Sequence, residues 1–164
     1  MSRLESTPYD QALHLLAFRA RSEAELRHRL MQMARGSGGD AAAVEDAILR
    51  LREQKVLDDE DFARQFARHK LAGARASRRR IVQELARKGI PRDVADRAIA
   101  DVTENEAVDP AAAAHRAAAK KWKSLSSLDE PTRRRRVYAF LARRGFDADE
   151  IRAVLAELGV ETDT

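Results

Sequence analysis

Residues 77–90 combine arginines, two spaced apolar residues and a final glycine in a pattern that predicts one helix. Ser77 is a candidate N-cap, because its hydroxyl can accept a hydrogen bond from a free backbone N–H. Ile81 and Leu85 lie four residues apart and share a helix face, and Gly89 can adopt the left-handed conformation that ends many helices. The pattern returns at 133–146 and, more faintly, at 22–36. A helix that recurs in this way predicts a repeat protein.

The interval between the copies sets the predicted domain boundaries. A shift of 56 residues superposes 85–90 on 141–146, and a shift of 55 superposes 22–30 on 77–85. The chain is rich in Ala and Arg and has few Gly and Pro residues, a composition that favours helix. We therefore predict an all-α fold of three tandem three-helix, helix-turn-helix-like repeats, at 8–55, 56–104 and 109–159. Each repeat is too small to bury much apolar surface alone, so neighbouring repeats must share it.

Local signals indicate where the helices begin and end. Ser22 and Glu25 form a capping box, and Asp58 is the predicted N-cap of a helix whose first turn is acidic, which suits the positive end of a helix dipole. The last helix is expected to end at Gly159, leaving a frayed tail over 160–164. In the first helix the predicted buried stripe is Ala12, Leu13, Leu16, Ala17 and Ala20.

Charge is strongly segregated along the chain. Segment 64–88 contains nine Lys and Arg residues and one acidic residue, and segment 116–144 contains ten and two, so each carries a net charge of +8. The whole chain has a net charge of +4, which leaves 4 − 16 = −12 for the remaining residues. A basic helix face is often simply solvated, but two equal basic blocks at the same phase of a repeat favour binding to phosphates or to an acidic protein surface.

Helical phase identifies the basic faces. With about 100° per residue, Arg79 points about 160° away from Ile81, and Arg80 and Arg87 point about 100–120° to one side. The equivalent positions in the third repeat are also arginines, whereas the first repeat has Ala, Glu and Gln there. The residues that we expect to bind a partner or nucleic acid are Arg75, Arg78, Arg79, Arg80, Arg87, Lys88, Lys120, Lys121, Lys123, Arg133, Arg134, Arg135, Arg136, Arg143 and Arg144.

Several motifs together resemble the RecX family of regulatory proteins. They are 21–26 (RSEAEL), 57–66 (LDDEDFARQF), 84–90 (ELARKGI), 120–122 (KKW) and 140–146 (FLARRGF). The resemblance covers about residues 8–158, and the order and spacing of the motifs make it specific. This chain departs from the pattern in the Gly-rich insertion at 36–39 and in the acidic stretch before Pro110.

The resemblance implies both a shape and a role. It implies an elongated, curved array of three-helix repeats that binds in the groove of the RecA filament on single-stranded DNA. It also implies that the protein restrains the recombinase, ATPase and coprotease activities of RecA in DNA repair and the SOS response. The expected partners are the RecA filament and single-stranded DNA, with double-stranded DNA as a further candidate. We expect a cytoplasmic monomer without a cofactor.

Other chemistry finds little support in the residues. Trp122 lies among lysines and could stack on a base, but a lone Trp on an Ala-rich helix more often belongs to the core. The acidic run 58–61 could hold a divalent ion, but helix capping explains it. The four histidines are scattered, there is no cysteine and no phosphate-binding glycine loop, so neither a metal site nor catalysis is predicted.

The sequence lacks the features of a membrane protein and has few of those expected in a sequence-specific DNA-binding protein. No apolar run approaches the roughly 18–20 residues of a membrane span, and residues 1–10 lack the apolar core of a signal peptide. A tandem helix-turn-helix nucleic-acid-binding protein, such as a transcription regulator, remains the alternative function. The arginine faces lack the Asn and Gln residues that often read base edges, which disfavours it.

Overall fold

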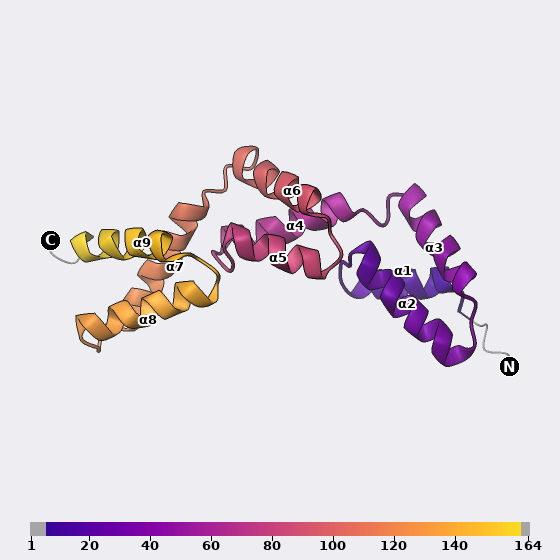
Figure 1. Ribbon diagram of the computed structural model, residues 1–164, viewed down its shortest axis with the longest axis horizontal. Coiled ribbons are helices and arrows are strands. Elements are labelled where there is room, and N and C mark those ends of the chain that lie inside the picture. The colour runs from indigo at the N-terminus through magenta and orange to yellow at the C-terminus, as the bar shows by residue number, and fades with distance from the viewer. Residues whose placement is uncertain (1–5, 162–164) are drawn as a thin grey trace. The chain divides into compact units, whose positions relative to one another are not determined.

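Residues 6–161, which the computed structural model describes, form α-helices joined by short turns and contain no strand (Figure 1). The all-α prediction is thereby confirmed. The first three helices are α1 (Pro8–Phe18), α2 (Glu23–Ser37) and α3 (Ala41–Glu53). They are followed by α4 (Asp59–Ala72), α5 (Arg78–Arg87) and α6 (Arg92–Glu104). The last three are α7 (Pro110–Ser124), α8 (Glu130–Arg143) and α9 (Ala148–Glu161).

Side-chain caps fix the beginnings of these helices. The Ser22 hydroxyl accepts a hydrogen bond from the Glu25 N–H, and the Glu25 carboxylate accepts one from the Ser22 N–H, as the capping-box pattern predicts. Asp40 is the N-cap residue of α3, and Asp129 is the N-cap residue of α8. Asp58 accepts from the N–H groups of Glu60 and Asp61, which confirms its role as the cap of α4.

The chain forms two compact units, and the middle helices contribute to both. One unit comprises residues 1–63 and 85–95, and the other comprises 64–84 and 96–164. The division of the chain into repeats at 8–55, 56–104 and 109–159 remains a prediction. None of the helices within 6–161 is long and apolar enough to cross a bilayer.

Each unit has its own apolar core, built from one stripe of each helix. In the first unit the core lies between α1, α2 and α3, and its fully buried side chains include Leu26, Leu30 and Leu51. In the second unit the alanines of α7 pack against the apolar faces of α8 and α9, around Val137 and Leu141. The small alanine side chains let α7 approach α8 and α9 closely. The larger apolar residues of α8 and α9 fill the space that remains between the three helices.

Two details of the helices differ from the sequence-based expectation. In α1 only Ala12 is buried, because α2 and α3 cover one side of this helix and the described residues of the unit leave the other side uncovered. Leu13 and Ala17 are exposed, and so is Ala20, which lies beyond the end of α1. Helix α9 does not end at Gly159 but continues to Glu161. A Cβ at Gly159 would lie 2.6 Å from Nη2 of Arg134. The glycine therefore leaves space beside α9 for the guanidinium of this α8 residue. Residues 162–164 of the predicted tail lie outside the described residues.

We predict that truncating Leu85 or Leu141 to Ala lowers the free energy of unfolding by about 2–5 kcal/mol each. The two leucines occupy equivalent repeat positions, and both are 0% exposed, so each truncation leaves a cavity in packed surroundings. Urea denaturation of each variant measures the loss. Truncation of the half-exposed Leu49 provides the control and should cost much less.

Candidate nucleic-acid and partner interface

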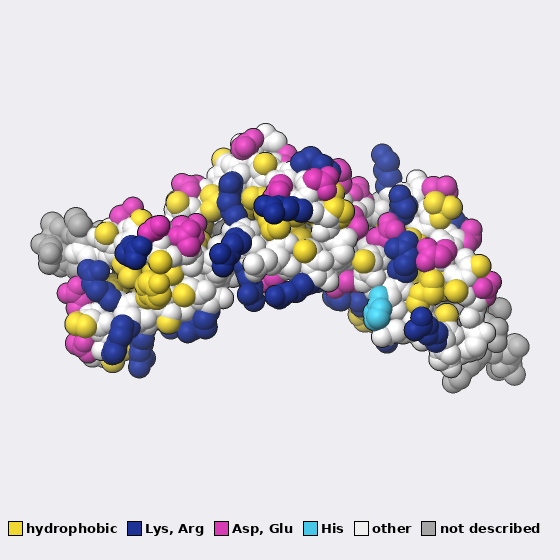
Figure 2. All heavy atoms as spheres, in the orientation of Figure 1, with side chains coloured by type: hydrophobic (Ala, Val, Ile, Leu, Met, Phe, Trp, Pro, Cys, Tyr) yellow, Lys and Arg dark blue, Asp and Glu magenta, His cyan; other side chains and the backbone are white. Residues whose placement is uncertain are grey.

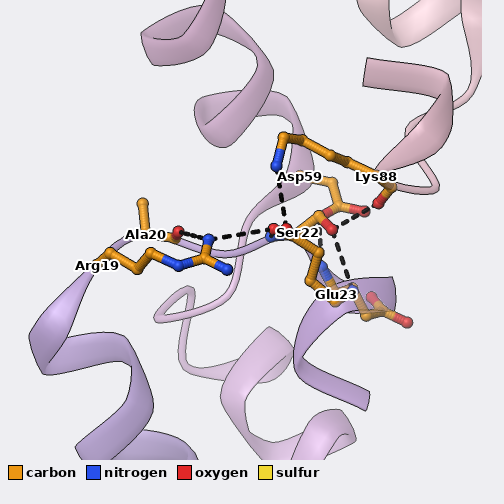
Figure 3. Close-up of polar contacts among 7 residues, drawn as sticks. Arg19, Ala20, Ser22, Glu23, Asp59 and Lys88 are labelled. Carbon is orange, nitrogen blue, oxygen red and sulfur yellow. Dashed lines mark hydrogen bonds and ion pairs between the residues drawn. The ribbon is translucent and has the colours of Figure 1, made fainter. Parts of the chain in front are cut away.

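A buried serine hydroxyl joins α2 to the turn that follows α5. Ser22 is 0% exposed, although it is polar. Its Oγ accepts from the Glu25 N–H at 3.2 Å and donates its own proton to the Lys88 carbonyl at 2.5 Å (Figure 3). The hydroxyl thus caps its own helix and satisfies a free carbonyl at the end of another helix. This bond lies entirely within the first unit.

The same contact recurs in the second unit, one repeat later. Ser77 is 4% exposed, and its Oγ accepts from the Arg80 N–H at 3.2 Å and donates to the Gly145 carbonyl at 2.7 Å. The Ser77 N–H also donates to the Arg144 carbonyl at 2.8 Å. We call these two contacts the serine junctions. The second places the start of α5 directly against the end of α8.

Each serine junction requires a glycine just after the helix whose end accepts the serine proton. This glycine is Gly89 after α5 and Gly145 after α8. Gly89 and Gly145 both have positive φ, of 78° and 88°, which side chains rarely adopt. A Cβ on Gly89 would lie 2.4 Å from Cβ of Ala24, and one on Gly145 would lie 2.8 Å from Cβ of Arg80. The glycines therefore serve both the turn conformation and the close approach of the two helix ends.

Ion pairs reinforce the junction in the first unit. The Lys88 ammonium lies 3.0 Å from the Glu25 carboxylate, and Asp59 accepts from the Glu23 N–H at 2.8 Å (Figure 3). Burial opposes ionisation of Glu25, but Lys88, the Ser22 N–H and Arg19 together hold its pKa below the ordinary value. Burial raises the pKa of Asp59, and the neighbouring Glu23 carboxylate adds to this.

Some predicted basic residues of α5 are bound by other side chains, and others are not. Arg80 is bound to Glu84 at 3.1 Å, and Lys70 lies 2.8 Å from the other oxygen of that carboxylate. Burial opposes the ionisation of Glu84, but these two cations still hold its pKa below the ordinary value. Arg78 donates to the Thr103 hydroxyl at 3.0 Å. Arg79, by contrast, is exposed and contacts no charged or hydrogen-bonding group of the described residues.

In the third repeat, the guanidiniums of two arginines lie over aromatic rings. The Arg133 guanidinium lies 4.0 Å from the centre of the Trp122 ring and donates to the Trp122 carbonyl. The Arg144 guanidinium lies 3.6 Å from the centre of the Phe140 ring. Trp122 is 5% exposed, so the core interpretation of this residue is confirmed, and its ring is not free to stack on a base.

The remaining predicted residues differ in how firmly they are held. Arg134 forms an ion pair with Glu130 at 2.8 Å. Arg135 reaches the Thr132 hydroxyl at 3.3 Å, and Arg75 donates to the His69 ring at 2.7 Å. Within residues 6–161, the side chains of six predicted cations make no hydrogen bond, ion pair or ring contact, and they are Arg79, Arg87, Lys120, Lys123, Arg136 and Arg143.

Figure 2 shows dark-blue Lys and Arg side chains over both α5 and α8. In the second unit, the exposed arginines of these two helices include Arg79, Arg135 and Arg136. In the first unit Arg87 is exposed, whereas Lys88 is held by Glu25 and lies 5.9 Å from the centre of the Phe62 ring. Solvent-exposed cations without carboxylate partners are available for an external anion.

The structure also bears on the alternative chemistry. No group of three or more His, Asp or Glu side chains suited to a metal ion occurs in the described part of the chain. In the acidic run 58–61, Asp58 caps α4 and Asp59 binds the Glu23 N–H, so helix capping and packing account for both.

Sequence reasoning missed the second role of the serines and the role of Phe140. The signal for the serines was present, because Ser22 and Ser77 occupy equivalent repeat positions, whereas α3, α4 and α8 are capped by Asp. Phe140 is half-buried, and the Arg144 guanidinium lies over its ring. The four-residue spacing of the two residues was the signal for this contact, because residues i and i+4 of a helix share a face.

Comparison with known proteins identifies the family. Family models described as the first, second and third three-helix domains of RecX match residues 9–34, 58–99 and 108–155. The chain belongs to the RecX family. The regulatory protein RecX of Chromohalobacter salexigens is 37% identical over 157 residues, covering 95% of each chain. The regulatory protein RecX of Pelodictyon phaeoclathratiforme is 33% identical, covering 88% of this chain and 84% of its own.

Solved structures of RecX proteins have the same fold. The crystal structure of RecX from Lactobacillus salivarius superposes with a TM-score of 0.70 over 93% of this chain and 95% of its own, at 20% identity. A second RecX crystal structure gives a TM-score of 0.69 over 91% of this chain. Three tandem three-helix domains are thereby confirmed. Membership in a family of regulatory proteins also confirms the prediction that this chain is not an enzyme.

We predict that Ser22→Ala and Ser77→Ala each lower the free energy of unfolding by about 2–4 kcal/mol, since each removes a helix cap and leaves a partly buried carbonyl without its donor. Chemical denaturation of the two variants tests this. The control is Asp40→Ala, which removes an exposed cap that bonds only within its own turn, so it should cost only about 1 kcal/mol. Equal losses in all three variants would show that the junction bonds add nothing to capping.

Proposed function

We propose that this RecX protein binds the RecA filament on single-stranded DNA and modulates it, mostly by inhibition. The affected activities are recombination, ATP hydrolysis and the coprotease function of RecA in DNA repair and the SOS response. The protein acts in the cytoplasm as a monomer and needs no cofactor. The observation that carries this proposal is the match of all three RecX three-helix domains in order along the chain.

The charge distribution supports a filament as the partner. Exposed arginines without carboxylate partners lie on α5 and α8, at the same phase of two repeats. A filament of recombinase on DNA offers repeated anionic groups, so a protein with repeated cationic faces can bind several of them at once. The first repeat has Glu25 and Gln32 at equivalent phases, and Glu25 is already engaged by Lys88.

We predict that the purified protein suppresses RecA-dependent strand exchange and RecA ATP hydrolysis, and that it hydrolyses no ATP itself. Both reactions are measured across a titration of the protein at fixed RecA and single-stranded DNA. Unchanged RecA activity at concentrations that saturate any binding to DNA would contradict the proposal. A preference for bare duplex DNA over the RecA filament would instead favour a helix-turn-helix regulator.

We predict that the combined variant Arg79→Gln, Arg135→Gln and Arg136→Gln weakens binding strongly while changing stability by only a few tenths of a kcal/mol per residue. All three side chains are exposed, so folding depends little on them. If they contact phosphates of a single strand, the plot of log K against log salt should flatten by roughly 2, at about 0.7 per contact. If they contact acidic groups of RecA, filament binding should fall while binding to bare DNA changes little.

A matched charge control is available in the first unit. Arg29, Arg35 and Lys55 are exposed cations outside the basic faces, and changing them to Gln removes the same net charge. This control variant should retain filament binding and most of the salt dependence. Equal losses in both variants would show that total charge, and not its position on α5 and α8, determines binding.

A further inference from the structure

Four cations lie near the end of α8 in the second unit, two over the Phe140 ring and two beside Arg144, without an acidic partner among the described residues. The Arg144 guanidinium lies 3.6 Å from the ring centre and the Lys121 ammonium lies 5.9 Å from it. Arg143 and Arg75 are both close enough to Arg144 to repel it. No ion pair joins any of these four cations to a carboxylate of the described residues. We call them the Phe140 cation cluster.

The second serine junction builds this cluster. The bond from the Ser77 N–H to the Arg144 carbonyl, at 2.8 Å, places the turn after α4 beside the end of α8. Arg75 comes from that turn, Arg143 and Arg144 come from the end of α8, and Lys121 comes from α7. The cations therefore approach from three different parts of the chain, and the fold holds their backbones in place.

Arg144 is unsatisfied in this arrangement. Its Nη1 is buried and makes no hydrogen bond. Burial and repulsion from Arg143 and Arg75 lower the pKa of its guanidinium. Arg75 has one donor occupied, because arginine can only donate and its Nη1 lies 2.7 Å from Nε2 of His69. A buried donor among mutually repelling cations is costly unless an anion joins them.

We propose that the Phe140 cation cluster is a phosphate-binding site and that it receives a backbone phosphate of single-stranded DNA. A phosphate presents oxygens in several directions, so it can accept from guanidiniums that approach from α8 and from the turn after α4 at once. A carboxylate presents two oxygens in one plane and suits a single arginine fork, which makes it the poorer match. The assignment of the phosphate to a DNA strand, though not the site itself, rests on the proposed function.

The site is tested first with inorganic pyrophosphate, without RecA or DNA. Arginine side-chain N–H signals of the isotope-labelled protein are followed by nuclear magnetic resonance at constant ionic strength. Saturable shifts of the Arg75, Arg143 and Arg144 signals are expected. The exposed pair Arg75→Gln and Arg143→Gln should weaken pyrophosphate binding at least about tenfold, the effect of losing charge-assisted hydrogen bonds. Arg116→Gln, an exposed change on α7, is the control and should have no effect.

One further variant and two competition experiments test the nature of the ligand. Arg144→Lys retains the charge but loses the guanidinium that lies over Phe140, so it should also weaken pyrophosphate binding while the protein stays folded. A thymidine oligonucleotide should displace pyrophosphate from the protein. Failure of displacement would assign the site to free phosphate compounds and overturn the DNA assignment. Displacement by an acidic peptide at lower concentration than by the oligonucleotide would overturn the choice of phosphate over carboxylate.

The outcomes separate this site from the proposed function. Non-saturable shifts, or equal pyrophosphate binding by the Arg75→Gln, Arg143→Gln variant and the unchanged protein, would overturn the phosphate site. Saturable binding in a protein that leaves RecA activity unchanged would refute the modulation of RecA and leave the site intact.

Discussion

The fold depends on a serine hydroxyl that takes part in two hydrogen bonds at once. In each junction the oxygen accepts from a backbone N–H of the helix it begins, and its proton goes to a carbonyl at the end of a helix one repeat later. A three-helix repeat buries too little surface to be stable alone. A contact that satisfies polar groups of two helix ends therefore stabilises each repeat and fixes its neighbour, although the two junctions lie in different compact units.

The chemistry of the capping group distinguishes α8 from the other two helices at this repeat position. Helix α8, the equivalent of α2 and α5, is capped by Asp129, whose carboxylate accepts from the Thr132 N–H. An ionised carboxylate accepts hydrogen bonds but cannot donate one. The start of α8 thus has its cap, but the capping carboxylate has no proton to donate to a carbonyl of another helix, as the Ser22 and Ser77 hydroxyls do.

Much of the fold could be predicted because local signals and the repeat agree. The capping box at Ser22 and Glu25, the caps at Asp40 and Asp58 and the buried pair Leu85 and Leu141 are all visible in the sequence. The errors arose where packing, not periodicity, decides burial. Helix α1 is apolar on more than one side, and only its contacts with α2 and α3 determine which side is covered. A glycine near the end of α9 was interpreted as a stop, but it provides space for Arg134.

The candidate site was predictable as a composition but not as a set of contacts. Sequence alone treats fifteen cations alike, whereas the structure binds Arg80, Arg134 and Lys88 to carboxylates and leaves others exposed. This sorting depends on where Glu84, Glu130 and Glu25 fall in space. Two of these lie four residues from their arginine on the same helix, so helical spacing could have found them. The Lys88 pair joins residues 63 positions apart, and only the serine junction brings them together.

The electrostatics of α5 connect the junction to function. This helix begins with Arg78, Arg79 and Arg80 and has no acidic residue in its first turn, so cations lie at the positive end of its dipole. The arrangement disfavours the helix, and folding tolerates it because the buried Ser77 hydroxyl caps that end. The same bond network holds the backbone of Arg144 beside the start of α5, and Arg143 and Arg75 repel the Arg144 guanidinium there. The interaction that stabilises the junction therefore also maintains a concentration of positive charge that attracts an external anion.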